Sequence, residues 1–524
     1  MTRRWPALVL ILALFVGGAL VGRDGATDAE DPAVDASTLL PVAAPADALG
    51  SVWFCAGQTA GDDTDADGTL VIANPSEDPA AGQVEAVSAD GETASQGIEV
   101  APWTTTRLRV ADLLEAEWAA ARIETTSGTV AVDHEVVGPE GRDAAPCQTR
   151  AGDRWLLPAG ASTRDARLTL LVYNPYPDAA TVDMSFTTPE GVRRPSDLQG
   201  IPVPAESVVP VNVSDVVTIR PVISTTVTTL RGRVVVDRIQ TDDGRGAATT
   251  EEEAAQELFK REGLTLTPAV ARAGTRWSFA AGLRGQGIHE QITVFNPTDE
   301  VAEVDITLAL EDPERNGVLD PFPMEVAPGG TEVFDVDGAE AVPEGVTHSV
   351  DVQSTNGVPV VAERALSVTD PASYRAELTS TGSPVAAAQW VFPSGRVSLT
   401  GQLDRIAVTN PGDEGVEISV RAFGDGALSE PLGEGPLVLG PGESREVDLD
   451  ELNGLDGEGE AGEDQRSLQV EATGPITAER RIIAGRAEPE GGEDEGGEDE
   501  GAHGTGGSVT TGIPVGPRFV ILGP

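Results

Sequence analysis

One pattern of residues occurs four times along this chain, and it constrains the fold more than any other feature of the sequence. Each copy opens with a tryptophan that is followed by a glycine four or five positions later, and about 20 residues after the tryptophan an alternating run ends in Asn-Pro. Successive copies lie about 100–120 residues apart, which is the length of whole domains and much longer than a solenoid repeat. The tryptophans are Trp53, Trp155, Trp277 and Trp390, and the asparagines are Asn74, Asn174, Asn296 and Asn410.

Short alternating runs within each copy predict antiparallel strands. A period of two places one face of a strand in the core and the other in water. Proline cannot donate a hydrogen bond to a sheet, so each Asn-Pro ends its strand, and the asparagine side chain bonds to the backbone of the turn. About seven such strands fit each copy, and the 60 Gly and 38 Pro suit the turns between them. The sequence therefore predicts an all-β protein, a tandem array of four immunoglobulin-like or fibronectin-like antiparallel β-sandwich domains.

We place the four sandwiches at residues 51–152, 153–274, 275–387 and 388–524, each large enough to own a core. Residues 249–262 contain helix formers and an acidic first turn, which predicts one exposed helix inserted in the second sandwich. Acidic, glycine-rich insertions at residues 454–464 and 488–507 of the fourth sandwich are predicted to stay unfolded. A last strand around Phe519 resembles the start of a fifth copy, and the sequence leaves open whether it pairs with the fourth sandwich or with another edge.

The four tryptophans and a repeated acid–base pair are the residues that stand out chemically. A tryptophan at the start of a strand in every copy is what core packing requires, so we interpret all four as buried; an exposed row would instead indicate sugar stacking. Adjacent residues on a strand point to opposite faces, so an acid and a base that are neighbours cannot act on one atom together. We expect each acid to bond a loop and each base to be exposed or to bridge to the next domain. The pairs are Asp133-His134, Asp237-Arg238, Glu363-Arg364 and Glu479-Arg480.

The first 23 residues predict a membrane segment. Arg3 and Arg4 precede an apolar run at residues 5–21, and Asp24 follows soon after. A run of about 17 residues is at the lower limit for a spanning helix, and the flanking charges place the rest of the chain outside the cytoplasm. We expect an uncleaved transmembrane anchor at residues 1–23, with a cleaved signal and a secreted protein as the alternative. Residues 24–50, rich in Ala, Asp and Pro, are predicted to form a disordered tether.

The only two cysteines, Cys55 and Cys147, both lie in the first copy. An exported chain enters an oxidising compartment, where such a pair usually forms a disulfide, and two unpaired buried thiols are the alternative. A zinc site is disfavoured because cysteines this far apart lack the paired spacing that zinc sites use.

Charge and motifs narrow the ligands. The chain carries 86 Asp and Glu against 35 Lys and Arg, a net charge of -51, which argues against nucleic acid because phosphates would be repelled. Asp63, Asp65 and Asp67 match the first half of a calcium loop, but its twelfth position is Asn74 instead of Glu, so a solvated acidic loop is the competing interpretation. We find no metalloprotease, nucleophile-elbow, phosphate-loop or dinucleotide-binding motif, and we predict no catalytic residue and no other cofactor.

The anchor, the aromatic starts such as Trp53-Phe54 and the four Asn-Pro strands resemble an uncharacterised family of exported actinobacterial proteins, known as a domain of unknown function. The resemblance covers most of the chain, from about Ser51 onward. It implies a location in the cell envelope and no established activity, and it carries over no catalytic or ligand residue.

Repeated whole domains, one anchor and no distinctive site lead to a functional hypothesis. We expect a non-enzymatic, membrane-tethered scaffold, spacer or interaction protein outside the cytoplasm, with envelope proteins or cell-wall glycan as partners. A cell-wall carbohydrate-binding array is the alternative, and exposed tryptophans would indicate it. A hydrolase is the third hypothesis, and it would need clustered acids in a cleft.

Overall fold

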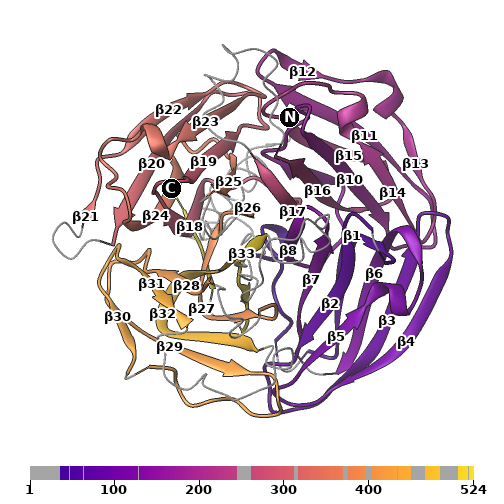
Figure 1. Ribbon diagram of the computed structural model, residues 1–524, viewed down its shortest axis with the longest axis horizontal. Helices are drawn as coiled ribbons and strands as arrows, with labels where there is room; N and C mark the ends of the chain where they lie inside the picture. The colour runs from indigo at the N-terminus through magenta and orange to yellow at the C-terminus, as the bar shows by residue number, and fades with distance from the viewer. Residues whose placement is uncertain are drawn as a thin grey trace, which may run out of the picture. The chain divides into compact units, whose positions relative to one another are not determined.

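The structure is a computed structural model of the chain, drawn as a ribbon in Figure 1. The chain divides into Met1–Asp35 and Ala36–Pro524. The described residues are 36–45, 48–62, 64–127, 129–244, 261–311, 317–369, 376–395, 403–433, 435–449, 466–483, 506–516 and 519–523. They form strands and five short 3-10 helices, with no α-helix among them. Within these ranges no helix is long and apolar enough to cross a membrane, and the anchor predicted at residues 1–23 lies outside them.

In the strands of the first two repeats, buried side chains alternate with more exposed ones. In β11, Val182, Met184 and Phe186 are buried and the residues between them are half-buried. The first repeat comprises β1 (Ser51–Ala60), β2 (Asp67–Ala73), β3 (Ala80–Ser88), β4 (Thr93–Val100), β5 (Thr105–Arg109), η2 (Val110–Asp112), β6 (Ala116–Ser127), β7 (Ala131–Gly138) and β8 (Gly141–Pro146). The second comprises β9 (Arg154–Leu157), β10 (Ala166–Asn174), β11 (Ala180–Thr188), β12 (Gly191–Arg193), η3 (Ser196–Leu198), β13 (Ile201–Val203), β14 (Ser207–Asn212), η4 (Val213–Asp215), β15 (Ser224–Arg231), β16 (Val235–Asp243) and β17 (Glu262–Pro268).

The last two repeats follow the same order of strands. The third comprises β18 (Arg276–Leu283), β19 (Ile288–Phe295), β20 (Ala302–Leu310), β21 (Gly317–Val318), β22 (Phe322–Val326), β23 (Thr331–Asp335), η5 (Val336–Gly338), β24 (Thr347–Ser354), β25 (Val361–Val368) and β26 (Ala376–Thr381). The fourth comprises β27 (Val385–Phe392), β28 (Leu403–Thr409), β29 (Val416–Phe423), β30 (Leu437–Leu439), β31 (Ser444–Asp448), β32 (Ser467–Ile483), β33 (Gly507–Thr511), β34 (Ile513–Pro514) and β35 (Phe519–Ile521).

Two antiparallel sheets enclose the core of a repeat, which confirms the predicted fold class. In the second repeat the sheets have the orders β14-β10-β16-β17 and β12-β11-β15-β9, and the third repeat has β23-β19-β25-β26 and β18-β24-β20-β21. In the fourth repeat the two sheets are joined because β32 is long enough to pair with β27 and β29 in one and with β28 in the other. In the first, β1 joins β2 through one parallel pair, Thr59 and Asp67.

The closing strands β8, β17, β26 and β33 were not predicted individually. Each adds to the edge of the sheet that holds its Asn-Pro strand, next to β7, β16, β25 or β32. Each closing strand also packs against the closing strand of the next repeat, and β33 packs against β8, so the four repeats contact one another in a closed cycle (Figure 1). Because the last repeat contacts the first, the four repeats do not form an extended row of domains.

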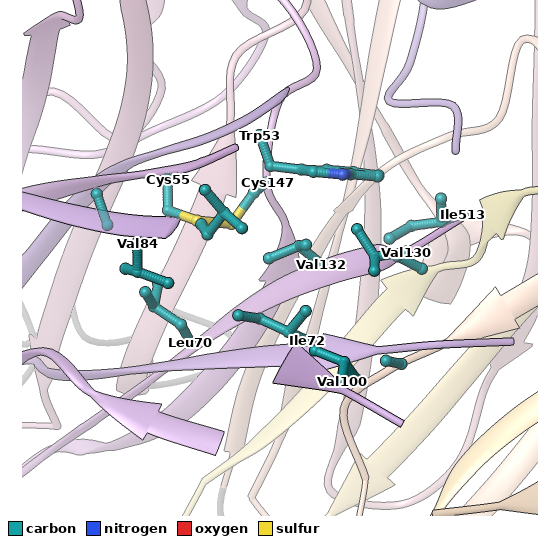
Figure 2. Packing of buried hydrophobic residues seen from close by; sticks show 14 of the residues in the cluster. Trp53, Cys55, Leu70, Ile72, Val84, Val100, Val130, Val132, Cys147 and Ile513 are labelled. Atoms are coloured by element: carbon teal, nitrogen blue, oxygen red, sulfur yellow. A yellow bond between two sulfur atoms is a disulfide. The ribbon is translucent and has the colours of Figure 1, made fainter. Parts of the chain in front are cut away.

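The second repeat has a core cluster of its own, whereas other clusters combine side chains of two repeats. The cluster around Trp53 and the disulfide of the first repeat also contains Val391, Phe423 and Ile513 of the fourth, and Figure 2 shows Ile513 among these side chains. A second cluster joins side chains of the first and second repeats, where Phe54 and Tyr173 meet edge to face. Apolar contacts therefore continue across the repeat boundaries.

The N-terminal tether prediction, residues 24–50, is wrong for residues 36–45. Ala36–Thr38 form the 3-10 helix η1, and Ala36, Leu39 and Ala43 are buried. Ala43 N–H donates to the Pro514 carbonyl, which holds this segment against the last repeat. The composition of this segment is typical of a flexible linker. Its small and apolar side chains are nevertheless buried against the folded chain, which the local sequence does not indicate.

At the C-terminal side, β35 around Phe519 pairs with β27, which settles the open alternative in favour of the fourth repeat. β27 begins at Val385, three residues before the predicted start of that sandwich. The predicted helix at 249–262 lies outside the described residues except for its end, where Glu262 begins β17. The insertion at 454–464 also lies outside them, and so do residues 488–505 of the insertion at 488–507.

Candidate functional site: the repeat junctions and the central cavity

All four repeat tryptophans are buried, each with an exposed fraction of 0% or 1%. The indole nitrogens of Trp155 and Trp277 donate at 2.8 Å to the carbonyls of Val234 and Val360. In Figure 2, Trp53 lies beside the disulfide in the core of the first repeat. A buried indole face cannot stack against a sugar, so these four residues do not form a glycan-binding platform.

The Asn-Pro asparagines are also buried and have a structural role. In the third repeat, Asn296 Nδ2 donates to the carbonyls of Glu300, Val326 and Ala327, while its Oδ1 accepts from Thr298 N–H at 3.0 Å. Asn74, Asn174 and Asn410 make the same set of contacts in their own repeats. One side chain thus joins the Asn-Pro turn to the strand that passes beside it.

In each of the four acid–base pairs, the acid binds the backbone of a neighbouring repeat. Asp237 accepts from Ala56 N–H at 2.9 Å, and Glu363 accepts from Ala159 N–H at 3.2 Å. Every donor belongs to the segment just after a repeat tryptophan. The fourth repeat's Glu479 accepts from Ala280 and Ala281 at 2.6 and 2.9 Å, and the first repeat's Asp133 accepts from Ser394 at 3.0 Å. We call Asp133, Asp237, Glu363 and Glu479 the acid belt, because their contacts run once around the cycle of repeats.

At three junctions, the base of an acid–base pair faces the belt acid of the following repeat. Arg364 Nη2 lies 3.1 Å from Glu479 Oε2, and both side chains are 1% exposed. Arg238 forms a bidentate pair with Glu363, and His134 Nε2 lies 3.6 Å from Asp237 Oδ2. The two arginine contacts confirm the expected bridges, whereas His134 Nε2 lies beyond hydrogen-bond distance of Asp237.

Arg480, the base of the fourth repeat, departs from this arrangement. Its guanidinium pairs with Asp404 of its own repeat at 2.6 Å, and it donates to the Ser394 carbonyl at 2.9 Å. The junction between the fourth and first repeats is therefore closed by the Asp133 contact and by side chains such as Thr105 and Ser467, whose hydroxyls lie 2.7 Å apart.

Burial shifts the ionisation of the belt where it meets the first repeat. Removal from water raises the pKa of Asp133 and of Asp237 to about 7, against the hydrogen bonds from Ser394 and Ala56, which lower it. Burial lowers the pKa of His134 to about 3. These junctions therefore hold a neutral imidazole and carboxyls that take up a proton near neutrality.

A small cavity of about 60 Å³ lies where the four closing strands meet. Leu266, Thr379 and Val509 line it from three of these strands, and residues 37–41 line one side. No Asp, Glu, Lys or Arg is among the described residues that line it. A volume of about 60 Å³ has room for water molecules, and the lining offers them neutral polar groups such as those of Thr379 and Gln148.

Cys55 and Cys147 form the predicted disulfide. Their sulfur atoms are thereby unavailable to a metal, although His134 lies beside them. Of the candidate calcium loop, Asp63 lies outside the described residues. Asp67 pairs with Arg109 at 2.6 Å and Asp65 with Arg167 of the second repeat at 3.1 Å, so both described carboxylates hold arginines in this structure.

Sequence reasoning missed the partners of the belt acids and several buried acids near the cavity. Asp143 in β8 accepts from Leu266 N–H of the second repeat at 2.7 Å, and burial raises its pKa well above the ordinary value. Threonines alternate with other residues in β17 and β26, and this alternation was an available signal for two of the closing strands. No signal in one sequence identifies a backbone N–H in another repeat as the partner of an acid.

Comparison with known proteins finds no match among curated proteins. Among solved structures, the Anabaena sensory rhodopsin transducer is 23% identical over 17% of this chain and 94% of its own, with a TM-score of 0.15. A tetra-tandem repeat from the extending region of a large adhesion protein is 11% identical over 88% of this chain and 99% of its own, with a TM-score of 0.10. The BSP domain of a biofilm associated protein is 10% identical over 89% of this chain and 96% of its own, with a TM-score of 0.15.

TM-scores this low support no inference about function. A family profile, in contrast, matches residues 132–259 and 240–493, which is more than half of the chain and spans parts of all four repeats. The chain therefore belongs to a family of unknown function, DUF5719.

Proposed function

We propose that this protein is a non-enzymatic scaffold or interaction protein of the cell envelope, tethered to the membrane by its N-terminal segment and located outside the cytoplasm. The acid belt is the observation that carries the proposal. Four carboxylates that could serve chemistry are buried and bonded to the backbone of other repeats, so they join the repeats into one body. Such a body suits a platform that presents surface loops to partners better than it suits an extensible spacer.

Two further features support the location. The disulfide between Cys55 and Cys147 is typical of proteins that fold in an oxidising compartment. Charge followed by an apolar run at residues 3–21 is typical of an export signal or anchor. The carbohydrate-binding alternative loses its main support, because the repeat tryptophans are buried.

Photocrosslinking in intact cells tests the proposal. Tyr176 follows an Asn-Pro turn and is 39% exposed, so a photoreactive phenylalanine at this position replaces a surface aromatic with a similar one. A scaffold should give discrete adducts with envelope proteins, and protease added outside spheroplasts should remove the chain. Adducts with polysaccharide alone, release of soluble sugar from purified cell wall by the full chain, or protection from the protease would each contradict the proposal.

A further inference from the structure

Three potential metal ligands converge in the third repeat. His289 of β19, Asp335 at the end of β23 and Asp337 of η5 offer donor atoms that all lie within 4.8 Å of one another. The sheet brings them together because Gln291 of β19 pairs with Asp335, and His289 lies two residues along on the same face. His289 Nδ1 contacts Asp337 Oδ2, and Asp337 N–H donates to Asp335 Oδ1 at 3.0 Å. We propose that His289, Asp335 and Asp337 form a binding site for a divalent transition-metal ion.

The burial of the three side chains suits a site that is rigid inside and open outside. The His289 imidazole is 7% exposed, whereas the carboxylates of Asp335 and Asp337 are 37% and 36% exposed. The imidazole is thus fixed by the protein, and an ion has an entry path past the carboxylates. The other described histidines, His134 and His348, have side chains that are 0% exposed and offer no such path.

The other repeats show that the fold does not require this group of residues. The positions equivalent to His289 and Asp335 are Asp67 and Arg109 in the first repeat, where the guanidinium bonds to the carboxylates of Asp67 and Asp62. In the second repeat they are Arg167 and Asn212, and in the fourth Leu403 and Asp448. The third repeat alone combines an imidazole with two carboxylates here.

In the first repeat a cationic side chain occupies the place of Asp335. In the first repeat Arg109 supplies the positive charge between two carboxylates, whereas in the third repeat Asp335 stands at the position of that arginine. The nearby Arg284 donates to the carbonyl oxygens of Asp337 and Val342 and not to the carboxylates. The strongly negative chain also raises the local concentration of divalent cations.

The chemistry of the donors selects the class of metal. One imidazole nitrogen and two carboxylates suit zinc and similar ions, whereas calcium takes six to eight oxygen ligands. Ligands of a tetrahedral ion with bonds of about 2.1 Å stand about 3.4 Å apart, so modest rotations of the two aspartates complete the site, with water as the fourth ligand.

This inference does not depend on the proposed scaffold function, and calorimetry tests it. The full chain, prepared without a histidine tag, should bind Zn²⁺ at one saturable site per chain, while Ca²⁺ should not compete for it. Bound Co²⁺ should show the visible absorption bands of a site with a nitrogen ligand, which weak binding to surface carboxylates does not produce.

Variants separate the site from general binding by an acidic chain. H289A and D337N should each weaken Zn²⁺ binding by about tenfold or more and remove the Co²⁺ bands, and D337N preserves the shape of the side chain if H289A folds poorly. E325Q, which removes an exposed acid from the same repeat, should bind like the unmodified chain. Zn²⁺ binding that is unsaturable, or equal in H289A, D337N and E325Q, would overturn the proposal.

Discussion

The asparagine of each Asn-Pro motif connects the turn that follows it to a neighbouring strand. Asn296 is fully buried and its amide nitrogen has three carbonyl partners. N296D keeps the shape but cannot donate, so it should lower the free energy of unfolding by about 2–4 kcal/mol through carbonyls left without partners. N356D, at an exposed turn asparagine of the same repeat, is the control and should cost less than about 1 kcal/mol. Urea unfolding of the two variants measures the difference, and equal losses would contradict it.

Trp277 tests the structural role of the repeat tryptophans. It is fully buried and its indole nitrogen donates to Val360 O at 2.8 Å. W277A should destabilise the protein by about 3–5 kcal/mol, the usual cost of deleting a large buried aromatic side chain. W277F keeps much of the apolar volume and loses the hydrogen bond, so its loss should be smaller. Denaturant unfolding gives both values, and a W277A loss below about 1 kcal/mol would show that the side chain does not fill the core.

At the scale of elements, strands from different repeats are held by buried charge pairs. Arg364 of β25 and Glu479 of β32 are each 1% exposed, and Glu479 also accepts from two backbone N–H groups of β18. Removing either partner should cost about 3–5 kcal/mol, because the remaining charge stays buried. A double-mutant cycle with R364M and E479Q should give a coupling energy of about 1–3 kcal/mol by urea unfolding.

The exposed pair of Arg167 and Asp65 is a matched control for that cycle. It also joins two repeats, at 3.1 Å, but its side chains are 53% and 57% exposed. Water screens such a pair, so the cycle with R167M and D65N should give less than about 0.5 kcal/mol. Equal coupling in the two cycles would mean that burial does not strengthen the junction between the third and fourth repeats.

At the scale of the whole molecule, buried carboxyls make stability depend on pH. Burial raises the pKa of Asp133, Asp237 and Asp242 from the ordinary 3.8 to about 7. Above about pH 4 the native state keeps protons that the unfolded chain has released, so stability falls as the pH rises and levels off above about 7. His134, whose pKa burial lowers to about 3, acts in the opposite direction, chiefly below about pH 6.5.

Urea unfolding at about pH 6.5 and 8.5 tests the carboxyls, because over this interval that histidine offsets only about 0.4 kcal/mol. Each of the three should contribute about 1 kcal/mol less stability at the higher pH. D237N keeps an acceptor for Ala56 N–H and has no proton to lose, so it should reduce the difference between the two pH values by about that amount. Stability that rises over this interval, or a D237N variant with the same pH dependence, would contradict the assignment.

The chain order of strands was readable because its causes are local. Alternation in runs such as β11, the stop at each proline and the bonding capacity of Asn174 act over a few residues, so one sequence predicts the all-β class and the repeated sandwich pattern. The disulfide was readable too, because Cys55 and Cys147 are the only cysteines. For the belt, the recurring acid–base pairs could be recognised as structural, but their partners could not.

Only the tertiary structure decided how the repeats close on one another and which residues meet there. The contact of Asp133 with Ser394 joins positions 261 residues apart, and the burial of Leu39 and Ala43 depends on surfaces built by later repeats. Such contacts depend on the curvature of sheets and on backbone groups, and neither has a signature in the local choice of residues. The same holds for His289, Asp335 and Asp337, because the register of two strands and a turn places them together. Local chemistry thus determined the elements of this protein, while packing between distant segments determined its junctions and its candidate metal site.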